Sequence, residues 1–173
     1  MSNFVTTEQV LQRVADIMDQ RMEKRVKELE YAQNRLEIEP VRKWLLMEFS
    51  FPEGASRGDF PKGVVDVDTR RSERREQDTG ETAEIDVVLT IYFSREGLSA
   101  SDAKRRAVRY GDAMLYTLMR EAKGRRPSDA TALPGWFRIW PVDMTPGLVR
   151  RSDLMGAQVR ARVTIDSQDS YAA

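Results

Sequence analysis

A strand and a helix that follow each other without interruption are the feature that most limits the fold. Over residues 85–93, strongly apolar side chains occupy every second position, which is the pattern of a β-strand with one buried face. After a turn, Ser99 supplies a helix cap and Asp102 a first-turn carboxylate. Apolar residues then recur at helical spacing, which predicts a helix over residues 99–124. Because neither element buries its apolar face alone, we expect the helix to lie across the sheet that contains the strand.

A second long helix is predicted at the N-terminus, over residues 6–38. Thr6 and Gln9 have the spacing of a capping box, in which side chains and backbone amides exchange hydrogen bonds. Apolar residues recur at helical steps through this range, and Pro40 ends the pattern. Charged residues crowd the second half of the helix. Two interpretations of that half stay open: it is solvated, or it meets a neighbouring subunit.

The remaining regular segments are predicted to be strands. Residues 63–93 have the pattern of a long β-hairpin with a highly charged tip. A second hairpin is predicted over residues 136–165, with a short first strand that ends at Pro141 and a turn at residues 144–147. The apolar segment 41–51 fits either a buried strand or the end of a helix, because periodicity alone does not separate the two.

Together these elements predict one α+β domain over residues 1–173. It consists of an antiparallel sheet with a long β-hairpin, packed by a long N-terminal helix and a central helix. Residues 167–173 are expected to form a polar tail. The predicted core combines the apolar faces of the two clearest strands and the central helix: Ile85, Val87, Leu89, Ile91, Leu115, Leu118, Val159, Ala161 and Val163.

Missing residue types and motifs exclude several functions. The chain has no Cys and no His, so it has neither a thiolate nor an imidazole for catalysis or zinc binding. The glycine-rich stretch 54–58 lacks the Gly-Lys-Ser/Thr ending of a phosphate loop. We interpret Asp66, Asp68 and Asp86 as a solvated strand face opposite arginines and not as a metal site. The sequence therefore predicts no enzyme, no cofactor and no metal.

Membrane and export signals are also not visible in the sequence. No apolar run approaches the roughly 20 residues of a membrane-spanning helix. The N-terminal residues lack the charged and apolar segments of a signal peptide. We therefore expect no membrane partner.

Two groups of arginines form the candidate interface: Arg70, Arg71, Arg74 and Arg75 on the long hairpin, and Arg160 and Arg162 on the last strand. Lys+Arg and Asp+Glu number 28 each, and this zero net charge disfavours a general nucleic-acid binder. Glu73 and Glu76 neighbour the hairpin arginines, which weakens phosphate binding further. Protein assembly is the favoured interpretation, with DNA contact or a solvated tip as alternatives. The aromatic residues Trp136, Phe137 and Trp140 are interpreted as core or interface residues.

The order and length of the elements resemble the tail terminator (tail completion) proteins of long-tailed bacteriophages and the related head-to-tail joining proteins. The resemblance is a pattern of elements without a short signature motif. The extra segment 41–60 and the longer N-terminal helix depart from the compact members of the family. The residues that carry the resemblance are the helix around 10–22, the strand 84–91, the helix with Ala107, Met114, Leu115 and Leu118, and the strand 159–165.

The resemblance implies a structural virion protein without catalysis. Such proteins form a ring, commonly hexameric, that caps the tail tube, stops its polymerisation and joins it to the head connector. The implied partners are further copies of the chain, the tail tube protein, the head connector protein, and genomic DNA that passes through the lumen without sequence-specific binding. The implied location is the neck of the virion, after assembly in the host cytoplasm. Two alternatives stay open: a DNA-contacting module that uses the arginine-rich hairpin, and a non-viral assembly or adaptor domain.

Overall fold

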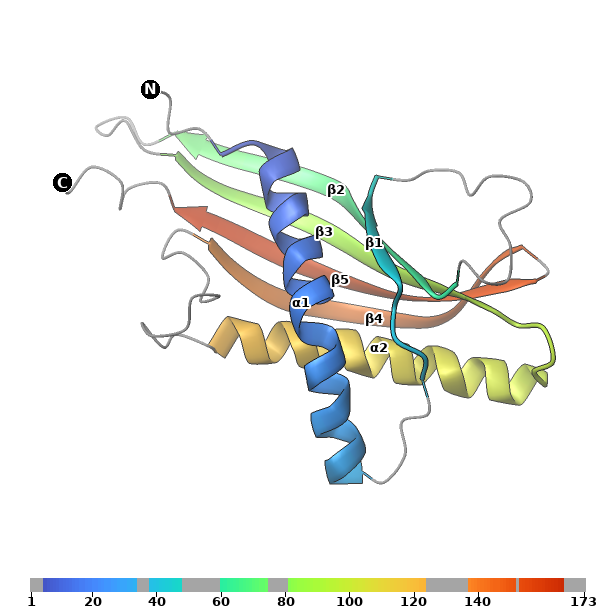
Figure 1. The fold of residues 1–173 in the computed structure, drawn as a ribbon. Coiled ribbons are helices and arrows are strands. Elements are labelled where there is room, and N and C mark those ends of the chain that lie inside the picture. Colours follow the sequence, from blue (N-terminus) through green and yellow to red (C-terminus); the bar gives the residue numbers. More distant parts are fainter. Residues whose placement is uncertain are drawn as a thin grey trace.

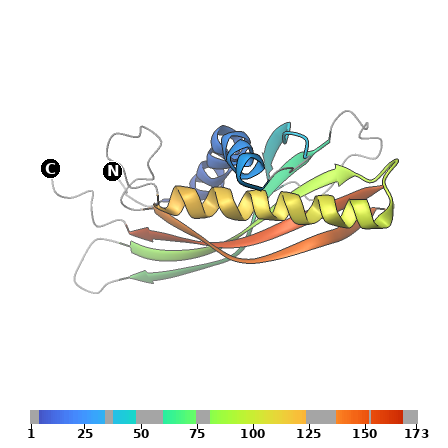
Figure 2. The ribbon, with the colours of Figure 1, turned by 90° about the horizontal axis from the view of Figure 1, so that it is seen from below.

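The described elements build an α+β fold with two helices and one mixed sheet. The computed structural model describes residues 5–33, 38–47, 60–74, 81–123, 137–151 and 153–166. In chain order the elements are α1 (Thr7–Gln33), β1 (Lys43–Leu46), β2 (Lys62–Arg74), β3 (Glu81–Ser94), α2 (Ala100–Lys123), β4 (Phe137–Arg151) and β5 (Leu154–Asp166). The strands lie in the order β1-β2-β3-β5-β4. Both helices cover the same face of the sheet, as Figures 1 and 2 show, and this confirms the predicted fold class.

The cap and the apolar face of α1 agree with the prediction. The Thr6 N–H donates to Gln9 Oε1 over 2.8 Å, and the Gln9 N–H donates to Thr6 Oγ1 over 3.2 Å. The helix is described as far as Gln33; residues 34–37 lie outside the described part, and Ile38 is not helical. The apolar face of α1 is buried against the sheet and α2, through Val10, Leu11, Val14, Met18, Met22 and Val26.

The centre of the sheet and α2 form the main core, as predicted. Strand β3 pairs antiparallel with β2 on one side and with β5 on the other. Helix α2 begins where expected, since the Asp102 N–H donates to Ser99 Oγ over 3.1 Å. It packs on β4 and β5. All the predicted core residues are buried except Leu115, which is partly buried against the same cluster.

The sheet is not purely antiparallel, because β1 pairs parallel with β2. Lys43 to Leu46 lie opposite Lys62 to Val65 in this pairing. The segment that follows β1 is too long for a tight hairpin, and a parallel pair requires a connection of about a dozen residues or more. Within segment 41–51, residues 43–46 thus form a short strand at the edge of the sheet, and residues 48–51 lie outside the described part of the chain.

Strand β4 is longer than predicted and passes through both of its prolines. We expected the strand to stop at Pro141 and a turn to form at residues 144–147, and both expectations were wrong. The pairing with β5 shifts register directly after Pro141 and again after Pro146, and Gly147 has a φ of 83°. Proline is tolerated at such irregular positions of an edge strand, because no outer neighbour requires its missing N–H.

Several predicted features lie outside the described residues. They are the hairpin tip 75–80, the loop 48–59, Gly124, Trp136 and the tail 167–173. Among the helices that the structure describes, none is both long enough and apolar enough to cross a membrane.

Candidate assembly surfaces

We call the face of the sheet opposite the helices the open face. It is polar around Asp86 and Arg162, and at one end it carries a small apolar cluster of Val64, Tyr92 and Leu154 packed with Phe60. No described helix lies on it (Figure 2). Arg162 projects from it between two neighbours in the register, Asp86 on β3 and Trp140 on β4. Arg162 Nε donates to Asp86 Oδ1 over 2.9 Å, and its Nη1 lies 4.0 Å from Glu84 Oε2. The hydrogen bond that Arg162 donates to Asp86 and the negative charges of Asp86 and Glu84 raise the pKa of Arg162, so this side chain stays charged. Arg160 lies next to it, exposed on the same face.

Arg70, one of the predicted interface residues, does not lie on this open face. The pairing of β2 with β3 shifts register between Val67 and Thr69. A shift of one residue moves every following side chain to the other face of the sheet. Arg70 therefore points to the helix layer, where its Nη1 donates to the Val5 carbonyl over 2.9 Å and to Thr7 Oγ1 over 3.1 Å. It holds the start of α1 on the sheet.

Of the other three hairpin arginines, only Arg71 has a described side chain. Arg71 lies opposite Glu84, is exposed, and makes no ion pair with the described residues. Arg74 is the last residue of β2, but its side chain is not described, and Arg75 lies outside the described residues. Their role in an interface stays a prediction.

The paired aspartates show no sign of a metal site. Asp66 Oδ1 accepts a hydrogen bond from the Val67 N–H over 2.8 Å, and Asp86 accepts one from Arg162. Asp68 sits at the register shift and does not share the alternation of Asp66. Within the residues that the structure describes, no group of three or more His, Cys, Asp or Glu side chains is placed to hold a metal ion.

Large apolar side chains are exposed on both edges of the sheet. On β4, Trp140 is 53% exposed, Val142 58% and Val149 61%; directly after β1, Met47 is 39% exposed. Among the described residues, Met119 on α2 is the other large apolar side chain with comparable exposure. Single exposed apolar residues are ordinary, but their concentration on edge strands is typical of a contact surface. Sequence reasoning missed Val142 and Val149, because β4 was expected to end before them.

The β4 edge is poorly suited to pairing with another strand. Pro141 and Pro146 lack backbone N–H groups, and each is next to a register shift. Prolines and bulges are devices that prevent edge-to-edge pairing of sheets. A partner at this edge must therefore be held by side chains more than by an extended ladder of backbone hydrogen bonds.

A cavity of about 250 Å³ lies between α1 and the segment that leads into β1. We call it the α1 groove. Tyr110 on α2 holds one wall in place, because its hydroxyl donates to the Glu39 carbonyl over 3.0 Å. Burial raises the pKa of Tyr110, so the hydroxyl keeps its proton and remains a donor. The groove is lined by the apolar residues Met18, Met22, Val26, Ile38, Pro40, Val41 and Trp44, and rimmed by Asp19, Glu23, Lys27 and Glu39.

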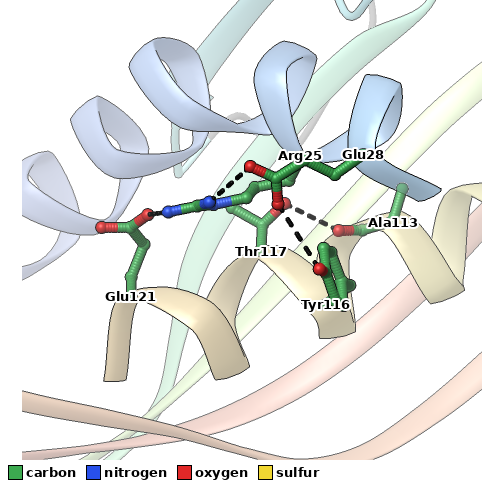
Figure 3. Close-up of polar contacts among 6 residues, drawn as sticks. All are labelled: Arg25, Glu28, Ala113, Tyr116, Thr117 and Glu121. Atoms are coloured by element: carbon green, nitrogen blue, oxygen red, sulfur yellow. Dashed lines mark hydrogen bonds and ion pairs between the residues drawn. The ribbon is translucent and has the colours of Figure 1, made fainter. Parts of the chain in front are cut away.

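The second half of α1 packs on α2 through a polar cluster (Figure 3). Arg25 Nη1 donates to Glu28 Oε1 over 2.8 Å, and Arg25 Nη2 donates to Glu121 Oε1 over 3.0 Å. The Tyr116 hydroxyl donates to Glu28 Oε2 over 3.4 Å. The side chains of Arg25 and Glu121 are only 15% and 8% exposed. From the sequence we expected this half of α1 to be solvated or to meet a neighbouring subunit, and neither interpretation included a contact with α2. The contact fixes how α1 crosses α2.

No protein-family model matches this chain, and no curated protein matches it in sequence. Function must therefore be inferred from the surfaces of the molecule and from the order of its elements. The surfaces that stand out are the open face, the apolar side chains on the two sheet edges and the α1 groove.

Proposed function

We propose that this chain is a structural protein of the phage head–tail junction, forming a ring that caps the tail tube and joins it to the head connector. The observation that carries the proposal is the exposure of large apolar side chains at both edges of one sheet, on the edge strand β4 and at Met47 directly after the edge strand β1. The resemblance of the element order to tail terminator proteins supplies the biological setting. The proposed role is architectural and requires no catalysis, cofactor or metal.

A ring follows from the difference between the two edges. One edge is the long strand β4 with Trp140 exposed, and the other is the short strand β1, followed by Met47 and flanked by the α1 groove. When one edge of a copy meets the opposite edge of the next, the contact is heterologous and closes into a ring if the rotation is right. A two-fold dimer through either edge alone would leave the other edge uncovered in both copies.

The arginine at the centre of the open face has carboxylate partners within its own chain. Arg162 is paired with Asp86 and lies near Glu84, so its charge is largely compensated. Affinity for phosphate grows with each uncompensated cation that a surface offers. Arg162 is therefore expected to add little to phosphate binding by this face.

Sedimentation velocity and negative-stain electron microscopy at increasing concentration test the proposal directly. We expect closed rings, formed by the protein alone or together with its tail tube protein. Val142→Asp should impair ring formation because it places a charge in the edge contact. Met119→Asp, which changes an exposed apolar side chain on α2 instead of one on an edge strand, is the matched control and should assemble normally. A wild-type protein that stays monomeric under all these conditions contradicts the proposal.

The DNA-contacting alternative makes a different prediction for the hairpin. Under the ring proposal, the variant with Arg71, Arg74 and Arg75 replaced by Ser should keep its melting temperature but form rings or join tails poorly. Under the DNA alternative, the same variant should lose DNA binding. DNA binding is measured by fluorescence anisotropy at about 50 and about 200 mM salt. Tight binding by the wild type that weakens steeply with salt and is lost in the triple variant would favour the alternative.

A further inference from the structure

Trp140 is an exposed apolar side chain with three arginines near it on the open face. It lies on the open face, directly opposite Arg162 of β5 in the strand pairing. Arg138 is two residues away on the same strand, β4. Arg160 lies on the same face, two residues from Arg162 on β5 and opposite Asp143 of β4. Neither Arg138 nor Arg160 makes an ion pair or hydrogen bond within the described part of the chain. We call these four residues the Trp140 patch, and Trp and Arg are the residue types most enriched at the energetic centres of protein interfaces.

The α1 groove has the complementary properties. Its floor is apolar, and two of the residues there, Met18 and Met22, have side chains that adapt to an inserted group. Asp19 and Glu39 on its rim are exposed, and neither side chain makes an ion pair with a described residue. Its volume of about 250 Å³ is below the roughly 300–1,000 Å³ of small-molecule sites and suits a large side chain better than a metabolite.

We propose that the Trp140 patch of one copy docks on a second copy, with the Trp140 side chain in the α1 groove of that copy. The proposal rests on the proposed function, since it names the surfaces through which neighbouring copies in the ring meet. Trp140 lies on the open face, whereas the groove lies in the helix layer on the opposite side of the sheet (Figures 1 and 2). A chain therefore cannot fill its own groove with its own Trp140.

Charge complementarity selects the second copy as the occupant. Arg138 and Arg160 flank the tryptophan, and Asp19 and Glu39 rim the groove. Docking brings arginines and carboxylates that make no ion pair within the described part of their own chain next to one another around an apolar centre, an arrangement that sets orientation and disfavours wrong partners. The contact joins unlike surfaces, so each copy keeps a free patch on one side and a free groove on the other until the ring closes.

Disulfide trapping tests the contact itself, because the chain has no Cys of its own. Val142→Cys places a thiol beside the Trp140 patch, and Glu39→Cys places one on the rim of the groove. We expect an equal mixture of the two single variants to form a cross-linked pair under mild oxidation. Val149→Cys mixed with Glu39→Cys is the control: Val149 is exposed on the same strand but lies about 20 Å further along it, at the ordinary strand rise, and should not cross-link.

Charge reversal supplies a second, independent readout. A rim variant carries Asp19→Lys and Glu39→Lys, and a patch variant carries Arg138→Glu and Arg160→Glu. Each variant alone brings like charges together and should need at least about tenfold more protein to associate. An equal mixture of the two restores opposite charges at every contact and should associate like the wild type. Trp140→Ala should weaken association similarly and leave the melting temperature unchanged, because its side chain is exposed.

The outcomes separate this contact from the ring proposal. Cross-linking of positions 142 and 39, together with rescue in the mixed charge variants, supports the contact. Rings that form without this cross-link and tolerate both charge reversals overturn the contact and leave the ring standing. A wild-type protein that never associates overturns both.

Discussion

Replacing Arg25 by Met should destabilise the fold, whereas replacing Arg25 by Met and Glu121 by Leu together should cost far less. Arg25 is the main positive charge that faces Glu121 at the crossing of α1 and α2, and the Glu121 side chain is only 8% exposed. Removing the arginine leaves a nearly buried carboxylate without its cation. Replacing both partners removes the buried charge as well as the ion pair.

The magnitudes follow from the burial of the two groups. Breaking a buried ion pair on one side costs about 3–5 kcal/mol, and this pair retains some access to water, so we expect about 2–4 kcal/mol for Arg25→Met. Glu121→Leu should cost less, about 1–3 kcal/mol, because Arg25 keeps its bond to Glu28. The double variant should lie within about 1 kcal/mol of the wild type, since apolar replacements of buried ion pairs are often neutral.

Urea unfolding of the four proteins completes a double-mutant cycle. Each kcal/mol should also move the melting temperature by about 2–4 °C for a domain of this size. The control cycle uses Glu23 and Lys27, which form an ion pair of similar length on α1 but are 62% and 69% exposed, and its coupling should be much smaller than that of Arg25 and Glu121. If the double variant of Arg25 and Glu121 loses the sum of the two single losses, the cluster does not act as a buried ion pair.

Four further changes test other parts of the structure. Leu118→Ala removes a fully buried side chain of α2 and should lower the free energy of unfolding by about 2–5 kcal/mol in urea titrations. Arg70→Met should cost about 1–2 kcal/mol and speed hydrogen exchange in the first turn of α1, because it removes the bonds that hold that turn on the sheet. Gly63→Ala should cost about 1–3 kcal/mol, because the added Cβ would overlap the ring of Trp44; no effect on the urea midpoint would show that β1 moves freely. The neighbouring lysine lowers the pKa of Glu23, so this pair contributes above the ordinary glutamate pKa and is lost as the pH falls through the lowered value. Glu23→Gln should therefore lower the melting temperature slightly near neutral pH and leave it unchanged at acid pH below that value.

The sequence alone determined the features that depend on neighbouring residues. The exchange of hydrogen bonds between Thr6 and Gln9 and the bond from Asp102 to Ser99 each span three positions. The alternation over residues 85–93 and the helical spacing after it identified the central layer and nearly all of its core. Short-range capping and periodicity are enough for such features, because their partners are fixed by the local backbone.

Only the tertiary structure decided which surfaces those elements present. The register shift after Val67 turned Arg70 from the open face to the helix layer, and no local pattern marks that shift. Pro141 predicts the end of a strand. The pairing of β4 with β5 nevertheless continues past it, because an edge strand has no outer neighbour that would need the missing proline N–H. Arg25 finds Glu121 on another helix, 96 positions away along the chain. Strand register and helix crossings depend on contacts between residues far apart in sequence, so the exposed edges and the groove emerge only when the chain is folded.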